Sequence, residues 1–287
     1  MTWKRVATAA VLVPVVVGLV LWGSTEIVAL AIALVTLLAL FEYFALGEAI
    51  GHRAYRFWTA TCALVLIYSQ WQGRVEHGYA IGLVALERRF NGGPPSLDAV
   101  VFLFVLGIAA LTLATRRPMV EVLPAAGISA SGFILVAFPL SFAIPLHAIR
   151  GQGPALLLFA MVIVWVSDTA AYFAGRAIGK HPFAPKLSPN KTWEGAVAGF
   201  LASLVVAFAF MPWVNVALSD LLAMAALGNI AGQVGDLLES GYKRSAGIKD
   251  SGTLLPGHGG VLDRIDALIL AIPVVWYYWI LIYPLRW

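Results

Sequence analysis

Long apolar stretches separated by short polar segments run through the whole chain. Nine of these stretches predict helices that cross a membrane, because a crossing needs about 20 mainly apolar residues. They cover residues 6–22, 26–46, 57–71, 99–114, 123–147, 154–176, 195–217, 220–242 and 263–284. The pattern therefore predicts an all-α polytopic membrane protein with about nine transmembrane helices.

Residues 72–98 do not fit this pattern clearly. The stretch Tyr79–Leu86 is apolar but too short to cross a membrane, and it runs into the polar residues Glu87, Arg88 and Arg89. We interpret it as an interfacial piece followed by a loop. If it crosses instead, the orientation of every upstream span is inverted.

The composition supports a membrane protein and excludes several other classes. Of the 287 residues, 61% are hydrophobic and 12% are charged, and the mean hydropathy is +0.87. Soluble domains are about half apolar and about a quarter charged, so this chain has too few charges to cover a water-facing globule. Disordered, fibrous and nucleic-acid-binding proteins are excluded as well. The single cysteine, Cys62, excludes an internal disulfide framework and a cysteine-rich zinc site.

The basic residues indicate an orientation. If all nine stretches cross, 14 of the 19 Lys and Arg residues lie on the side of the N-terminus and 5 lie on the other. Cytoplasmic loops carry the excess of positive charge in membrane proteins. We therefore expect the richer side to face the cytoplasm.

Acidic residues collect in the second half of the chain. Eight of the fifteen lie between Asp168 and Asp266. We therefore assign residues 1–150 to a scaffold with possible oligomer contacts and residues 151–287 to a catalytic domain. Glu42 is the exception, because it lies inside an apolar stretch of the first half. It is either a functional carboxylate, as buried charges in membranes often are, or a carboxylate near the helix end that snorkels or bonds to a neighbouring helix. We favour the second interpretation.

The stretch 220–242 carries a polar stripe. Its members follow one another at steps of 4, 3, 4 and 3, so they share one face of a helix. A neighbouring face carries glycines, which permit close approach of another helix. We expect this helix to be packed on one side and to line a polar cavity on the other. The stripe consists of Asn229, Gln233, Asp236, Ser240 and Lys243, and the glycines are Gly228, Gly232 and Gly235.

A second polar face lies at the end of the stretch 154–176. Asp168, Tyr172 and Arg176 are spaced four residues apart and lie on one helix face. Arg176 is two turns from Asp168, which makes a pair within the helix awkward. A metal, a substrate or another helix is a better partner for Asp168, although a structural hydrogen bond between helices is an alternative.

Two polar loops follow these helices. Residues 179–195 combine lysines with small hydrogen-bond donors, which suits phosphate binding; a basic cytoplasmic loop would explain the lysines alone. Residues 249–266 form a glycine-rich turn into the last helix, and exposed amides at a helix start bind anions. Asp263 and Asp266 in the first turn of that helix fit Mg²⁺ held for a phosphate-bearing substrate.

These segments resemble a known family. The motif Ser240-Gly-Tyr-Lys-Arg-x4-Lys-Asp-x-Gly-x2-Leu-Pro-x-His-Gly-Gly-Val-x-Asp-Arg-Ile-Asp266 is similar to the signature of phosphatidate cytidylyltransferases, or CDP-diacylglycerol synthases. Ser167-Asp-Thr-Ala-Ala-Tyr and Ser188-Pro-Asn-Lys-Thr-Trp-Glu-Gly195 also resemble that family. The resemblance is strong over residues 154–270. Tyr242 stands where the family usually has an aliphatic residue, Met or Phe, a mild change in a hydrophobic position.

The resemblance implies a reaction and a set of site residues. CMP passes from CTP to phosphatidate, giving CDP-diacylglycerol and pyrophosphate, with Mg²⁺ as cofactor and K⁺ as a second metal. Asp236 and Asp263 would bind metal. The catalytic residues would be these two with Lys243, Arg244, His258 and Arg264. The substrate-binding residues would be Asp168, Ser188, Asn190, Lys191, Thr192, Glu194, Ser240, Lys249, Asp250, Gly259, Gly260 and Asp266.

The same resemblance implies the setting. We expect a bacterial inner membrane, a site open to the cytoplasm, contact with membrane lipids, and a homodimer. Alternative enzymes are a CTP-dependent lipid or polyprenol kinase and a cytidylyltransferase with another lipid acceptor. A transporter could use the polar stripe as a pathway, but the sequence shows no convincing internal repeat. The motif of CDP-alcohol phosphotransferases is absent from the sequence.

Overall fold

A helix lies in each of the nine predicted spans, but the helix in the span predicted at 195–217 ends at Phe210. The computed structural model describes residues 2–73, 94–254 and 259–283. The first half contains α1 (Thr2–Trp22), α2 (Thr25–Ala49), α3 (Arg56–Gly73), α5 (Leu97–Leu113), α6 (Met119–Gly132), the π-helix η1 (Phe133–Ala137), α7 (Phe138–Ser141) and α8 (Ala143–His147). The second half contains α9 (Gly153–Ile178), β1 (Pro182–Ala184), β2 (Ser188–Thr192), α10 (Trp193–Phe210), α11 (Leu218–Ser245), α12 (Leu262–Tyr277) and the π-helix η2 (Tyr278–Ile282).

Several of these helices can cross a membrane. In the described part of the chain, six are long and apolar enough to do so: 25–49, 119–147, 153–178, 193–210, 218–245 and 262–282. The apolar part of α1 and the whole of α5 are shorter. The protein is therefore an integral membrane protein, while a count of nine crossings stays a prediction. The interfacial piece predicted within 72–98 falls mostly on residues 74–93, outside the described residues.

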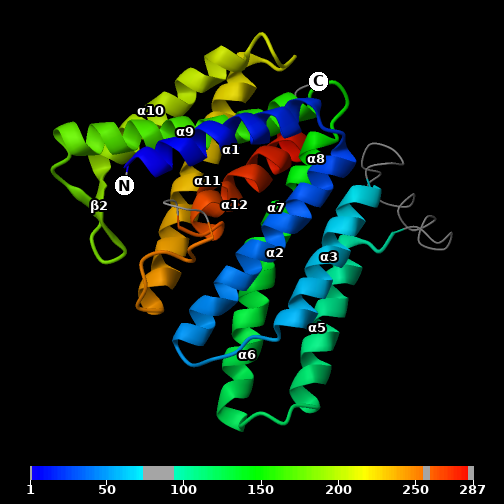
Figure 1. Ribbon diagram of the computed structural model, residues 1–287. Helices are drawn as coiled ribbons and strands as arrows, with labels where there is room; N and C mark the ends of the chain where they lie inside the picture. The colour runs from blue at the N-terminus through cyan, green and yellow to red at the C-terminus, as the bar shows by residue number, and fades with distance from the viewer. Residues whose placement is uncertain (1, 74–93, 255–258, 284–287) are drawn as a thin grey trace.

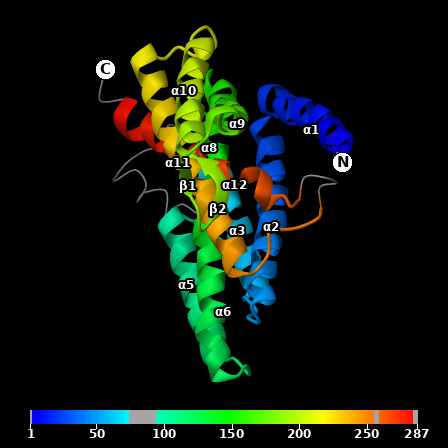
Figure 2. The same cartoon turned by 90° about the vertical axis from the view of Figure 1, so that its left-hand side faces the viewer.

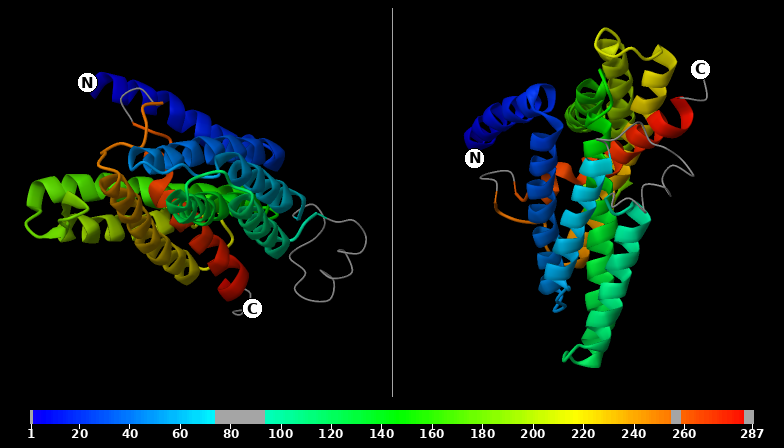
Figure 3. Two further views of the ribbon diagram at one scale, coloured as in Figure 1. Left: turned by 90° about the horizontal axis from the view of Figure 1, so that it is seen from below. Right: turned by 90° about the vertical axis from the view of Figure 1, so that its right-hand side faces the viewer.

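The helices form two groups that cross each other. In Figure 1, α2, α3, α5 and α6 run up and down the lower part of the view, while α9 and α10 run across its upper part with α1 beside α9. The side view in Figure 2 and the right-hand view in Figure 3 also show α5 and α6 below α9 and α10. The helix α12 lies between the groups and contacts α2, α7 and α8 as well as α9 and α11. Its position makes α12 the link between the two halves of the chain.

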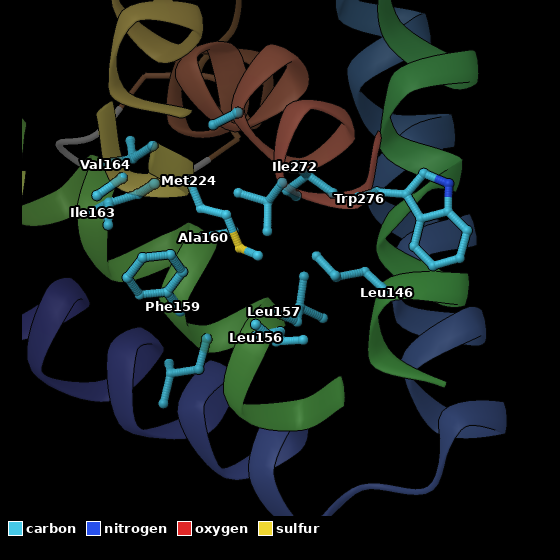
Figure 4. Packing of buried hydrophobic residues seen from close by; sticks show 14 of the residues in the cluster. Leu146, Leu156, Leu157, Phe159, Ala160, Ile163, Val164, Met224, Ile272 and Trp276 are labelled. Carbon is cyan, nitrogen blue, oxygen red and sulfur yellow. The ribbon is translucent and has the colours of Figure 1, made fainter. Parts of the chain in front are cut away.

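Each group has its own apolar core, and α12 contributes to both. Ala267 and Ile272 belong to the first core, whereas Leu262 and Ile269 belong to the second. Close packing of this kind holds helices together in a bilayer, where lipid tails are as apolar as the side chains. Figure 4 shows side chains of the first core pointing toward one another from α8, α9, α11 and α12, among them Leu146, Leu156, Phe159, Ile163, Met224, Ile272 and Trp276.

The span predicted at 123–147 is not one uniform α-helix. Pro139 stands at the start of α7, directly after the five-residue π-helix η1. Proline lacks an amide hydrogen and its ring displaces the carbonyl four residues earlier, so helices widen or kink before it. A second irregularity follows at Phe142, which separates α7 from α8.

The predicted glycine face of α11 packs closely against other helices, as expected. A Cβ atom on Gly228 would lie 2.8 Å from the Ile163 side chain of α9. A Cβ atom on Gly235 would lie 2.5 Å from the backbone oxygen of Asp266 in α12. These glycines therefore set how near α11 can come to its neighbours.

Residues 179–195, predicted only as a polar loop, contain a β-hairpin. β1 and β2 pair as an antiparallel hairpin, with Pro182 opposite Thr192 and Ala184 opposite Ser188. Short strands that contain prolines give no clear alternation of apolar and polar residues, which is the usual sequence signal for a strand. The edge-to-face contact between the rings of Phe183 and Trp193 holds the hairpin against the start of α10.

The contact at Gly235 makes a prediction about stability. Gly235→Ala should lower the thermal unfolding temperature of the protein in detergent, because the added methyl group must push α11 away from α12. Overpacking of this kind costs about 1–3 kcal/mol, against a gain of about 1 kcal/mol from the better helix propensity of alanine. Gly127→Ala in α6 is the matched control, since a Cβ atom there meets nothing within 4 Å. Equal unfolding temperatures for the two variants would contradict the packing argument.

Candidate active site

A pocket of about 270 Å³ opens between α9, the hairpin, α10 and α11. Most of its polar lining comes from residues that the sequence singles out. The lining residues are Ser167, Asp168, Ala171, Tyr172, Phe183, Asn190, Lys191, Thr192, Gly195, Ala196, Gln233 and Asp236. The helix face of Asp168 and Tyr172, the segment 179–195 and the polar stripe of α11 therefore meet at one place.

An ion pair joins two sides of this pocket. The Lys191 ammonium on β2 pairs with the Asp236 carboxylate on α11. Their side chains are 29% and 27% exposed, so both stay accessible to a ligand. Asp168 on α9 lies within electrostatic range of both groups. The pocket thus combines one lysine with two carboxylates.

The polar stripe of α11 is confirmed, and its members bond to one another and to neighbouring helices. Asn229 donates to the Ser167 hydroxyl on α9 at 2.6 Å. Gln233 donates to the Asn229 side-chain oxygen at 2.7 Å and to the Ala196 carbonyl of α10 at 3.1 Å. Because buried polar groups need partners, these bonds fix how α9, α10 and α11 meet below the pocket.

The hairpin is anchored where it enters α10. The Thr192 hydroxyl accepts the Gly195 amide at 3.2 Å and so caps the helix. Glu194 turns to the His181 ring, with its oxygen 2.6 Å from the ring nitrogen. Asn190, Lys191 and Thr192 therefore reach the pocket, whereas Glu194 supports the hairpin from outside its lining.

A second charged cluster lies where α11 meets the start of α12. The Lys243 ammonium contacts a Glu239 oxygen at 2.5 Å and an Asp263 oxygen at 2.7 Å. The lysine side chain is 13% exposed and each carboxylate side chain is 5% exposed. Two nearly buried carboxylates thus depend on one cation for neutralisation.

The amides at the start of α12 are occupied by carboxylates of the chain itself. Asp263 accepts from the amides of Gly260 at 2.8 Å and Ser251 at 3.0 Å. Glu42 of α2 accepts from the amides of Val261 and Leu262 at 2.9 and 2.8 Å. The interpretation of Glu42 as a carboxylate bonded to a neighbouring segment is therefore confirmed, and the anion at this helix start is provided by the protein.

The other predicted site residues have varied positions. Arg244 donates to the carbonyls of Leu187 and Ile248 and so ties the hairpin turn to the end of α11.

Two further predicted residues lie near Asp236. Ser240 lies 3.5 Å from Asp236, and the carboxylate of Asp266 is within electrostatic range of Asp236 and Glu239. Gly259 has a φ of 79°, which favours glycine. His258 lies outside the described residues. Ser188, Lys249, Asp250 and Arg264 are not among the lining residues of the pocket, although Arg264 lies within electrostatic range of Asp168.

Sequence reasoning missed four residues of this region. Ser167 and Phe183 line the pocket, and Glu239 and Ser251 belong to the cluster at α12. Glu239 had a local signal, because it stands four residues before Lys243 on the same helix. Ser167 also had a signal, because it begins the motif that contains Asp168. Phe183 and Ser251 become visible only when distant segments come together.

Carboxylates would supply the oxygen ligands for a magnesium ion bound at this site. Mg²⁺ prefers oxygen ligands and is often held by one or two carboxylates together with substrate phosphates. Asp236, Asp263 and Asp266 supply such oxygens on two adjacent helices. Among the described residues, no three Asp, Glu, His or Cys side chains converge tightly enough to hold a metal by themselves.

Fold and site together define a class: an integral membrane protein whose pocket combines lysine and aspartate side chains, which suits phosphate-bearing ligands. The model of the cytidylyltransferase family matches residues 3–282. The chain therefore belongs to the cytidylyltransferase family.

Curated relatives agree with this assignment. The chain is 48% identical over 132 residues to a protein of Staphylococcus saprophyticus named phosphatidate cytidylyltransferase, covering 45% of this chain and 51% of the relative. It is 44% identical over 134 residues to a protein of the same name from Haemophilus influenzae, covering 45% of this chain and 46% of the relative. The chain thus spans about half the length of the curated relatives that it matches.

The cluster at α12 predicts a stability effect. Lys243→Met should lower the unfolding temperature markedly, because it leaves Glu239 and Asp263 without their cation. Breaking a buried ion pair costs about 3–5 kcal/mol. Adding Glu239→Gln should recover part of the loss, since it removes one stranded charge. Lys186→Met, at an exposed position of the hairpin, is the matched control and should change little; equal effects at both lysines would refute the pairing.

Proposed function

We propose that this protein is a phosphatidate cytidylyltransferase, which transfers CMP from CTP to phosphatidate and releases pyrophosphate. A phosphate oxygen of phosphatidate attacks the α-phosphorus of CTP, a new P–O bond forms, and the bond to pyrophosphate breaks. The observation that carries the proposal is the family match over residues 3–282. The names of the relatives and the lysine–aspartate pocket support it.

We propose roles for the two lysines of the site. Lys191 is paired with Asp236, and Lys243 is paired with both Asp263 and Glu239. Substrate phosphates offer each lysine a partner of higher charge, so the lysines can turn to the phosphates when substrate binds. The carboxylates that they leave, Asp236 and Asp263, are then available for a cation. A bound cation would then replace the lysines as the counter-charge of Asp236 and Asp263.

The chemistry demands mainly positioning and charge neutralisation. A phosphate monoester is largely ionised at neutral pH, so the attacking oxygen needs no strong base, and alignment with the leaving group supplies most of the rate. A bound Mg²⁺ would neutralise charge on the triphosphate. We keep K⁺ as a proposed second metal. Asn190 and Thr192 beside Lys191 offer further donors to phosphate oxygens in the pocket.

The setting of the reaction is part of the proposal. The excess of Lys and Arg on one side of the predicted topology supports a pocket that opens toward the cytoplasm. Tyr172 and Phe183 line the pocket beside the charged groups, which suits a ligand with both a lipid and a nucleotide part. We also propose that residues 151–287 carry the catalytic groups and that the protein acts as a homodimer.

A single assay separates this function from its alternatives. Purified protein in detergent receives phosphatidate, Mg²⁺ and CTP labelled in the cytosine ring. We expect the label to enter the lipid phase with release of pyrophosphate. A CTP-dependent kinase would leave the cytosine label in water as CDP, and a polyprenyl phosphate tested in place of phosphatidate would reveal a different acceptor. Retention of all label in water would overturn the proposal.

Asp236 gives the sharpest test of the site. Asp236→Asn should reduce kcat by about 100-fold or more, as removal of one preorganised charge from a transition state does. Its unfolding temperature should stay close to that of the wild type, because the side chain is 27% exposed. Asp98→Asn, at an exposed position in the first turn of α5, is the matched control and should keep full activity. An active Asp236→Asn enzyme would contradict the assignment.

A further inference from the structure

The connection between α11 and α12 is held at both ends by one carboxylate from the other half of the chain. Glu42 lies on α2, and its oxygen Oε2 accepts the Ser251 hydroxyl at 3.0 Å and the Leu262 amide at 2.8 Å. Its oxygen Oε1 accepts the Val261 amide at 2.9 Å. Glu42 therefore ties Ser251, in the first half of the connection (residues 246–261), to the end of the connection at the start of α12.

The same two ends also meet on Asp263. The Ser251 amide donates to Asp263 at 3.0 Å, and the Gly260 amide donates to it at 2.8 Å. Asp263 in turn holds Lys243 at 2.7 Å. The position of the lysine thus depends on Asp263, and the position of Asp263 depends on segments that Glu42 holds together.

The space around Glu42 is closely fitted. A Cβ atom on Gly252 would lie 2.6 Å from its Oε1 atom, and a Cβ atom on Gly260 would collide with its Oε2 atom. Both glycines therefore allow the backbone to approach the carboxylate directly. The Glu42 carboxylate is therefore packed against the backbone of the connection at both Gly252 and Gly260.

The chemistry of the contacts requires a carboxylate. Each oxygen of Glu42 accepts a backbone amide, and both amides belong to the start of α12, where partial positive charge favours an anion. A glutamine has nearly the same shape, but its NH₂ group would face one of these amides, donor against donor. An aspartate keeps the charge but is one methylene shorter, so it cannot reach both ends.

We propose that Glu42 is a positioning residue of the active site: it holds the ends of the α11–α12 connection so that Asp263 and Lys243 face the substrate phosphates and the cation. This rests on the proposed function for the identity of the ligands. Glu42 itself touches neither ligand. A side chain of the amino-terminal half thereby contributes to the site.

Glu42→Gln tests the proposal against a purely space-filling role. With phosphatidate, CTP and Mg²⁺, we expect kcat to fall and the Mg²⁺ concentration for half-maximal activity to rise, each about 10-fold, at the lower end of what loss of a supporting contact costs at a metal site. The KM for phosphatidate should stay unchanged. Glu48→Gln, on the same helix and paired with Arg56 at the surface, is the matched control and should keep all wild-type values.

A second readout does not depend on activity. Lys249 is exposed and stands two residues before Ser251. Release of the connection should raise the rate of tryptic cleavage after Lys249 about 10-fold in Glu42→Gln and leave it unchanged in Glu48→Gln. If the wild type fails to turn over phosphatidate, the proposed function fails, while this cleavage comparison still tests the role of Glu42.

Further variants decide the matter if Glu42→Gln does not fold. Ser251→Ala removes one of the three bonds, and Gly252→Ala places a methyl group against the carboxylate. Both should shift the Mg²⁺ dependence and the cleavage rate in the same direction by a smaller factor. Wild-type cleavage and Mg²⁺ dependence in a folded Glu42→Gln protein, or in both of these variants, would overturn the proposal.

Discussion

Pairing of charges inside an apolar chain is the constraint on which the site depends. A charge removed from water is costly unless a partner neutralises it, and a membrane protein has few polar neighbours to offer. The nearly buried carboxylates of Glu239 and Asp263 meet this requirement with one lysine, Lys243, and with amides at the start of α12. These pairings determine the geometry of the charged cluster where α11 meets the start of α12.

The pairings neutralise the charges of the site and still leave its lysines able to bind a phosphate. A lysine that neutralises a carboxylate can instead neutralise a phosphate, and the pair at the pocket is still accessible, with Lys191 and Asp236 29% and 27% exposed. Lys191 comes from a hairpin strand and Asp236 from a long helix. Since the two partners belong to different elements, a ligand that separates them would bind between the hairpin and α11 rather than unfold either one.

The sequence predicts the parts of this structure that depend on local periodicity. Hydropathy locates the helices, and the steps of 4 and 3 identify the polar stripe of α11, whose Gln233 and Asp236 line the pocket. The hairpin was missed because strands of three and five residues carry too little pattern. The partner of Glu42 could not be inferred either, because Ser251 and Leu262 lie 209 and 220 residues away. Such contacts depend on how the two helix groups cross, which spacing along the chain does not encode.

The position of α12 shows why the two halves of the chain are not independent. Its side chains enter both apolar cores, its first turn is held by Glu42 from α2, and its backbone touches Gly235 of α11. A shift of α12 toward either group would therefore disturb the other group and Asp263 together. The proposed boundary near residue 150 assigns the charged side chains that line the pocket to the carboxyl-terminal segment. The site nevertheless depends on the amino-terminal half as well, because Glu42 of α2 accepts the amides at the start of α12, the helix that carries Asp263.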